Sequence, residues 1–216
     1  MPTLRFATAN LFTRFVDTDH LDAVLDEVDP DLLVTLELAP KAAEVIAAHY
    51  DRHHLRPEQG FEGWGVAGRF DLEADGQAGW GRGGAFRVDL PGSALNLAAV
   101  HLLDPMHTPR KVVTVRRRQV EALLEWGRSR PQGEPQLVAG DFNASPTWPA
   151  YRRLAGHWTD LVAEAGRARR TWGFPPGVRL FRIDHVLGSG LRAVDAGVVR
   201  VRGSDHAMVV VDLEVG

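Results

Sequence analysis

Residues 136–143 read Gln-Leu-Val-Ala-Gly-Asp-Phe-Asn, a short apolar run that stops at a glycine and two polar side chains. The run Gln136–Ala139 predicts a short buried strand, and Asp141 and Asn143 follow directly after it. Asp and Asn also favour turns, so this motif taken alone is better explained as a turn after a strand. Its functional interpretation therefore depends on whether other strands end in the same way.

Polar residues also follow other strand-like segments of the chain. The alternating run from Leu4 ends at Asn10, and the apolar run Leu32–Leu36 leads into Glu37. Burying an ionised carboxylate costs free energy unless a partner such as a metal ion compensates its charge. Sites are commonly built where loops leave one edge of a rigid sheet. The polar residues at predicted strand ends are Asn10, Glu37, His101, Asp141, Asp184 and Asp205.

The chemistry of these side chains favours a hard cation. Oxygen ligands such as those of Glu37, Asp205 and Asn10 select Mg²⁺ or Mn²⁺ over zinc, which prefers Cys and His. The chain has no cysteine, which excludes disulfides, thiolate metal sites and a cysteine nucleophile. Ser204-Asp205-His206 is not a hydrolase triad, because adjacent residues of an extended chain point to opposite faces.

Strand and helix patterns alternate along the 216 residues, which favours a single α/β domain with helices covering the sheet faces. An amphipathic helix with Thr18 or Asp19 as N-cap is expected to end at Asp29-Pro30. The Gly-rich stretch 60–84 predicts hairpins and a mobile loop. Further helices are predicted over 40–49 and 112–126, and further strands over 85–90, 95–101, 182–187, 193–202 and 207–215.

The ordered set of motifs closely resembles the endonuclease/exonuclease/phosphatase superfamily, which has the deoxyribonuclease-I-like fold. The resemblance runs from residue 4 to residue 213, and its most specific part is Gly-Asp-Phe-Asn followed some sixty residues later by Ser-Asp-His. It implies a four-layered α/β sandwich of two packed mixed β-sheets flanked by helices. The motifs are Asn10, Leu32–Glu37, Val100-His101-Leu102, Gly140–Asn143, Arg182–His185 and Gly203–His206.

The resemblance also implies a metal-assisted, in-line attack of water on phosphorus, with Mg²⁺ or Mn²⁺ as the cofactor. Glu37 would be the principal metal ligand, with Asn10 beside it and Asp205 as a further ligand. Asp141 would orient or deprotonate the attacking water, and Asn143 would hold that water and a phosphate oxygen.

Two histidines complete the implied site. His206 would contact the phosphate or transfer a proton, oriented by Asp184, since a His–Asp pair fixes the imidazole tautomer and raises its pKa. His101 would stabilise the phosphate or assist the leaving oxygen. Many members contact the phosphate with a Tyr or Arg from the middle of the chain, and Arg82 or Arg110 could substitute for it here.

The leading functional hypothesis is a nuclease for DNA or RNA with low sequence specificity. A phosphatase or a phosphodiesterase acting on lipid headgroups or small molecules is the first alternative, because the net charge of −3 gives no overall attraction to nucleic acid. A non-catalytic binding protein of the same fold is the second. Superfamily enzymes that repair abasic sites typically place Asn where His101 falls, which disfavours that role.

Three other features carry weaker hypotheses. The run Arg116–Arg118 is more often the solvated face of a helix than a nucleic-acid contact. Arg167, Arg169 and Arg170 are better substrate-facing candidates because their loop approaches Asp184. Trp148 is equally suited to stacking on a base and to covering a helix end.

The N-terminal sequence and the lengths of the apolar runs bear on where the protein acts and on its partners. The N-terminus, from Met1 to Phe6, leads directly into a strand pattern without the features of a signal peptide, and no apolar run is long enough to span a bilayer. We therefore expect a cytoplasmic monomer without membrane insertion, acting on a phosphodiester substrate that is most simply nucleic acid.

Overall fold

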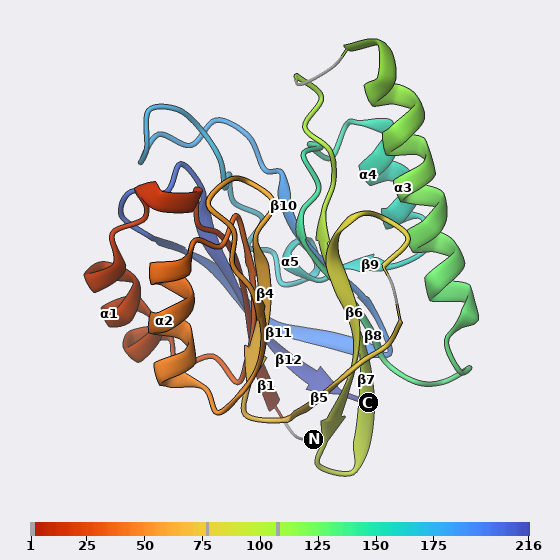
Figure 1. The fold of residues 1–216 in the computed structure, drawn as a ribbon. Helices are drawn as coiled ribbons and strands as arrows, with labels where there is room; N and C mark the ends of the chain where they lie inside the picture. The colour runs from red at the N-terminus through yellow and green to blue at the C-terminus, as the bar shows by residue number, and fades with distance from the viewer. Residues whose placement is uncertain (1–2, 77, 107–108) are drawn as a thin grey trace.

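Two six-stranded sheets pack face to face in the computed structural model, which describes residues 3–76, 78–106 and 109–216, with only the backbone described for 109–111. Helices cover the outer face of each sheet, so the molecule has four layers (Figure 1). This architecture confirms the expected α/β sandwich of two mixed sheets flanked by helices.

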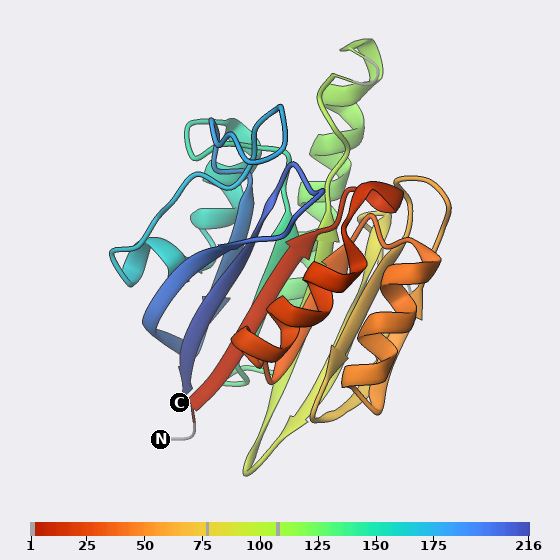
Figure 2. The same ribbon diagram turned by 90° about the vertical axis from the view of Figure 1, so that its left-hand side faces the viewer.

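The first sheet is built from the two ends of the chain and has the strand order β11-β12-β1-β2-β4-β3. Its central strands β1 and β2 are parallel, whereas β12 runs antiparallel to β1. The N- and C-terminal strands therefore lie side by side (Figure 2). Its strands are β1 (Thr3–Asn10), β2 (Leu32–Leu36), β3 (Arg52–Arg56), β4 (Trp64–Gly68), β11 (Leu191–Arg200) and β12 (Ala207–Val215).

The second sheet comes from the middle of the chain and has the order β5-β6-β7-β8-β10-β9. Here β7 and β8 are parallel, and β10 runs antiparallel to β8. Its strands are β5 (Asp71–Ala74), β6 (Arg82–Leu90), β7 (Ser93–His101), β8 (Gln136–Asp141), β9 (Thr159–Asp160) and β10 (Asp184–Ser189).

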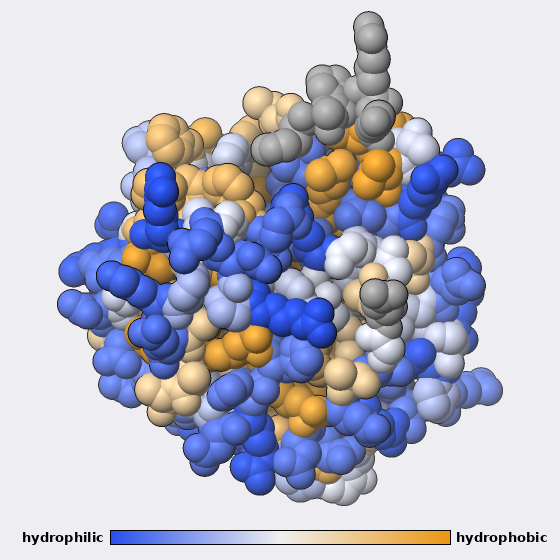
Figure 3. Space-filling model, viewed as in Figure 1, coloured by the Kyte–Doolittle hydropathy of each residue, from blue (hydrophilic) through white to orange (hydrophobic). Residues whose placement is uncertain are grey.

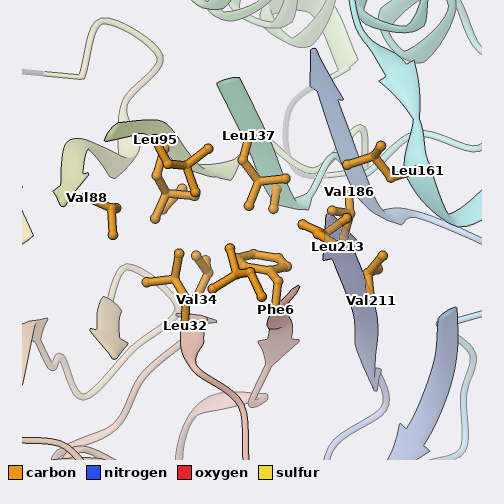
Figure 4. Packing of buried hydrophobic residues seen from close by; sticks show 14 of the residues in the cluster. Phe6, Leu32, Val34, Val88, Leu95, Leu137, Leu161, Val186, Val211 and Leu213 are labelled. Carbon is orange, nitrogen blue, oxygen red and sulfur yellow. The ribbon is translucent and has the colours of Figure 1, made fainter. Parts of the chain in front are cut away.

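Three hydrophobic clusters hold the layers together. The cluster between the sheets is shown in Figure 4, where Phe6 and Val34 of one sheet face Leu95, Leu137 and other side chains of the second. Full burial of each such side chain contributes roughly 1.5–3 kcal/mol. A second cluster joins the first sheet to helices α1 (Thr18–Val28) and α2 (Pro40–His49), and a third joins the second sheet to α3 (Pro109–Ser129) and α4 (Pro149–Ala155).

The strand directions bring the polar strand ends to one edge of the sandwich. The parallel strands β1, β2, β7 and β8 finish at this edge, and the antiparallel strands β10 and β12 begin there. In Figure 1 this is the upper end, opposite the two chain termini. It also carries the short 3₁₀ helix η1 (Thr13–Phe15) and the loops that follow β7 and β8. Motifs far apart in the sequence therefore share one rim.

Several local expectations need correction. Asp17 caps α1, since its carboxylate accepts a hydrogen bond from the His20 amide, 3.1 Å away. Strand β10 begins at Asp184, because the residues before it form a separate loop, and β11 ends at Arg200. The pattern also missed β3, whose sequence Arg-His-His-Leu-Arg is polar and mostly exposed. It missed β9 and the helices α4 and α5 (Leu161–Glu164) as well, which are too brief for their periodicity to be read. None of the described helices has the length and apolarity needed to cross a membrane.

Candidate active site

A cavity of about 700 Å³ opens at the polar edge of the sandwich. The polar residues on its wall come from strand ends of both sheets, and aromatic residues form much of its mouth. Of the eight predicted site residues, six line this cavity. They are Glu37, His101, Asp141, Asn143, Asp205 and His206; Asn10 and Asp184 lie directly behind them.

Asn10 ties the two sheets together at the base of the cavity. Its side-chain amide donates to Glu37 Oε1 over 3.0 Å and to Asp141 Oδ2 over 3.2 Å. Its oxygen accepts a hydrogen bond from the Phe12 amide. Glu37 Oε2 is buried and has no hydrogen-bond partner among the described residues. One oxygen of Glu37 is thus fixed, and the other is left available.

Asp205 shows the same division between its two oxygens. Oδ2 accepts a hydrogen bond of 2.9 Å from the indole N–H of Trp172. The buried Oδ1 has no hydrogen-bond partner among the described residues, although His206 Nε2 lies 3.9 Å from it. Ser204 holds the turn in place, because its hydroxyl donates to the Asn10 carbonyl and accepts from the His206 amide. The serine is therefore a structural link between β1 and β12, which agrees with the absence of a triad.

His206 and Asp184 form a buried pair. Nδ1 of His206 lies 2.9 Å from Asp184 Oδ2 and 3.1 Å from Oδ1, which leaves Nε2 directed toward Asp141 Oδ2 at 3.9 Å. The Thr171 hydroxyl accepts a hydrogen bond from the Asp184 backbone N–H and so fixes the start of β10. The ligand atoms of Asp141, Asp184 and His206 lie within 4.8 Å of one another, a spacing that could also hold a cation. Both Asp184 oxygens face His206 Nδ1, however, so this arrangement suits proton transfer better.

The second histidine faces the same acids. Nε2 of His101 lies 3.7 Å from Asp141 Oδ2 and 3.9 Å from Glu37 Oε1. Asn143 completes the group: its amide N–H donates to Asp141 Oδ1 over 2.7 Å, and its side chain donates to the Leu102 carbonyl. The loop after β8 is thereby locked to the loop after β7.

Burial and neighbouring charges set the two histidines apart. Burial lowers the pKa of His101 to about 3, and the charges of Arg82 and His206 act in the same direction. Burial would also lower the pKa of His206, but nearby carboxylates, Asp184 first, outweigh it and raise the pKa to about 10. At neutral pH the site therefore presents one neutral imidazole and one imidazolium.

Burial raises the pKa of two carboxylates of the site, Glu37 and Asp141. Burial raises the pKa of Glu37 to about 7, against the hydrogen bond from Asn10 and the charge of His206. Burial likewise raises the pKa of Asp141, although His206 opposes the shift. Glu37 therefore holds its charge poorly without a cation. Its Oε2 and the buried Oδ1 of Asp205, neither of which accepts a hydrogen bond from the described residues, fit a divalent metal ion.

The backbone is strained where two of these side chains leave their strands. Glu37 and Asn143 have φ values of 51° and 46°, in the left-handed region that non-glycine residues seldom adopt. Asn tolerates this conformation, whereas for Glu37 it costs on the order of 1–2 kcal/mol. The turn aims the Glu37 carboxylate into the cavity instead of along β2.

Other cavity residues were only partly foreseen. Arg82, one of the two candidates for the phosphate contact, lies opposite His101 in the β6–β7 ladder and pairs with Glu62 at the cavity wall. The side chain of Arg110, the other candidate, lies outside the described residues. Trp148 lines the cavity, and so does Trp172, which no sequence pattern singled out.

Arg116 corrects the prediction of a solvated arginine run. It is buried, and its guanidinium donates to the carbonyls of Leu103 and Phe142, so that α3 holds the loops after β7 and β8. Arg117 and Arg118 are exposed as expected. The helical position of Arg116, facing the sheet, is the signal that separates it from its neighbours.

A model of the endonuclease/exonuclease/phosphatase family matches residues 7–206. The chain belongs to this family. Members are in general phosphoester hydrolases that use a divalent metal, and the buried acid–histidine cluster is compatible with that chemistry. The family match and the two-sheet fold confirm the predicted resemblance.

Individual relatives agree with this assignment. The chain is 30% identical over 180 residues to an uncharacterized protein of Escherichia coli, YbhP; the match covers 73% of this chain and 64% of YbhP, less than two thirds of that relative's length. An endonuclease/exonuclease/phosphatase from Beutenbergia cavernae has a TM-score of 0.77 at 23% identity, covering all of this chain and 72% of its own. A humanized Danio rerio TDP2 has a TM-score of 0.76 at 16% identity, covering 98% and 99%. These structures share the fold.

Proposed function

We propose that this protein is a Mg²⁺- or Mn²⁺-dependent phosphodiesterase whose substrate is nucleic acid. The observation that carries the proposal is the pair of buried, unpartnered carboxylate oxygens, Glu37 Oε2 and Asp205 Oδ1, on the wall of one cavity. With Asn10 they would hold the cation. When bound, the cation supplies Lewis-acid stabilisation of the negative charge on the phosphate.

The protein's own side chains carry out the proton transfers. Asp141 takes a proton from the attacking water as the water oxygen bonds to phosphorus, and Asn143 fixes the Asp141 carboxylate for this purpose. The ester P–O bond on the opposite side then breaks. His206, kept protonated by Asp184, gives its Nε2 proton to the leaving oxygen.

Negative charge grows on the phosphoryl oxygens as water attacks, and donors already in place lower the barrier. His101 is neutral, so its N–H donates a hydrogen bond without competing with the cation. Arg82 lies beside it and would contact a phosphate oxygen on release from Glu62. The two histidines thus have separate roles, because a carboxylate is hydrogen-bonded to His206 and none is hydrogen-bonded to His101 among the described residues.

The test uses supercoiled plasmid and a generic aryl phosphodiester, each with Mg²⁺, with Mn²⁺ and with EDTA. We expect metal-dependent nicking that EDTA abolishes, and loss of turnover in Glu37→Ala and His206→Ala with the fold retained by circular dichroism. Cleavage of the aryl diester without nicking would favour a small-molecule or lipid-headgroup phosphodiesterase. No hydrolysis of either substrate would favour a binding protein of this fold.

A further inference from the structure

An arginine-rich segment, residues 166–183, borders the cavity, and its arginines have no role in the proposed chemistry, although Thr171 and Trp172 hold Asp184 and Asp205. It contains five arginines and no acidic residue, in a chain whose net charge is −3. It leads from the end of α5 to β10 and forms part of the loop cluster at the upper end of Figure 1. Trp172, Phe181 and Ile183 of this segment line the cavity. Arg167 pairs with Asp195 and Arg182 with Asp160, so the uncompensated charge of the segment comes from its other arginines.

Two aromatic rings of the segment extend outward from the catalytic histidine. The Trp172 ring centroid lies 6.4 Å from that of His206. Phe181 stacks on Trp172 with centroids 6.0 Å apart and an interplanar angle of 26°. Phe181 is 51% exposed, so a further planar group could continue this stack at the surface.

Two arginines lie close together beside these rings. Arg200 ends β11 opposite Ala207, the neighbour of His206, and its guanidinium covers Gly177, where an added Cβ would lie 3.2 Å from Nη2. Gly177 has a φ of +96°, so the loop closes over Arg200 only because a glycine stands there. Burial lowers the pKa of Arg179, and the charge of Arg200 lowers it further.

The two guanidiniums lack an internal counter-ion. Among the described residues, no carboxylate lies within ion-pair distance of Arg179 or Arg200, whereas Arg167 and Arg182 of the same segment each pair with an aspartate. Like charges held side by side repel one another, and an anion between them relieves the repulsion. A phosphate suits this position, since arginine is a planar, multidentate phosphate donor.

The cavity mouth also carries exposed apolar side chains. In Figure 3 apolar residues gather along the upper edge, over the loops at this end. Phe61, Met106 and Trp148 line the cavity and are exposed, Met106 at 85%. A lipid surface would also use such a rim, but the planar stack of Trp172 and Phe181 suits a nucleic-acid base better than an acyl chain. A row of rings beside unpaired arginines is typical of single-stranded nucleic-acid sites.

We infer that the segment 166–183 binds an unpaired stretch of nucleic acid, with one base stacked on Phe181 and a neighbouring phosphate between Arg179 and Arg200. The inference rests on the proposed phosphodiesterase function and specifies its substrate class. The strand is unpaired for two reasons. The reacting groups lie less than a tenth exposed at the base of the cavity, and a base inside a duplex has no free face for Phe181.

The test measures binding separately from turnover, by fluorescence anisotropy of a labelled single-stranded oligonucleotide in EDTA. We expect the same sequence as a duplex to bind at least about 10-fold more weakly. Phe181→Leu, which keeps an apolar side chain but removes the aromatic face, should weaken binding by about 10-fold. Arg179→Ala and Arg200→Ala should each reduce the slope of log K against log salt by about 0.7. Arg128→Ala, an exposed arginine of the last turn of α3, is the matched control.

Equal affinity for duplex and single strand, or variants that bind like the wild type, would overturn the inference. Loss of co-sedimentation with phosphatidylglycerol vesicles in the same variants, with oligonucleotide binding intact, would assign the rim to a lipid surface instead. Failure of the proposed function looks different: the wild type would bind the single strand as described but hydrolyse no diester with Mg²⁺ or Mn²⁺.

Discussion

Glu37 is the residue at which stability and metal binding should conflict most directly. Replacing it in Glu37→Gln keeps the oxygen that accepts from Asn10 and removes the charge from the unpartnered Oε2. The pKa of Glu37 is about 7 in the folded protein and 4.5 for a solvent-exposed glutamate. Ionising Glu37 therefore costs about 3 kcal/mol more in the folded state than in the unfolded state. We therefore expect metal-free Glu37→Gln to be more stable than the wild type at pH 8.

The pH dependence of this difference follows from the direction of the shift. Because the folded pKa of Glu37 is raised, the folded state holds the proton more tightly than the unfolded state between pH 4.5 and 7. The wild type therefore loses stability relative to the variant as the pH rises through that window, and the difference levels off above pH 7. At pH 4 the two proteins should unfold at nearly the same urea concentration.

The assay is urea unfolding in EDTA and in excess Mg²⁺. Mg²⁺ at a hundred times its dissociation constant should stabilise the wild type by about 2.7 kcal/mol and Glu37→Gln by much less. Glu44→Gln, an exposed carboxylate of α2, is the control and should behave like the wild type in both conditions. The reasoning fails if Glu37→Gln is less stable than the wild type in EDTA at pH 8, or if Mg²⁺ stabilises both proteins equally.

Three further predictions concern groups around the site. Asp184→Asn removes the carboxylate that keeps His206 protonated, and steady-state kinetics should show kcat falling about 10²- to 10⁴-fold with its pH profile displaced to lower pH; an unaltered profile would contradict the pairing. Burial lowers the pKa of His185 to about 4, so the unfolded state binds its proton first and stability is lost as pH falls from 6.5 to 4. His185→Gln should flatten that loss by on the order of 3 kcal/mol in denaturant titrations, and an unchanged slope would refute it. Arg116→Met should lower the free energy of unfolding by on the order of 2 kcal/mol and reduce kcat, because two loop carbonyls lose their donor. Arg117→Met, its exposed neighbour, is the control and should stay within about 0.5 kcal/mol of the wild type.

The sequence by itself determined the class of fold and which residue types stand at the strand ends. Apolar runs that stop at Asn10, Glu37, His101 and Asp141 are visible in one dimension, because burying a strand demands hydrophobic side chains and the change to polar residues marks its end. The order of these motifs was enough to indicate the family. Brief elements such as β9 and α5 left no such trace, because two to four residues cover only about one period and cannot show that it repeats.

Only the tertiary structure decided how these groups act on one another. The protonation of His206 and the neutrality of His101 depend on which carboxylate lies 2.9 Å away, and the packing of β10 in one sheet against the start of β12 in the other sets that distance. The sequence likewise could not separate buried Arg116 from exposed Arg117, or place Arg200 beside Gly177. Desolvation and Coulomb forces depend on position in space, and residues far apart along the chain supply most of both.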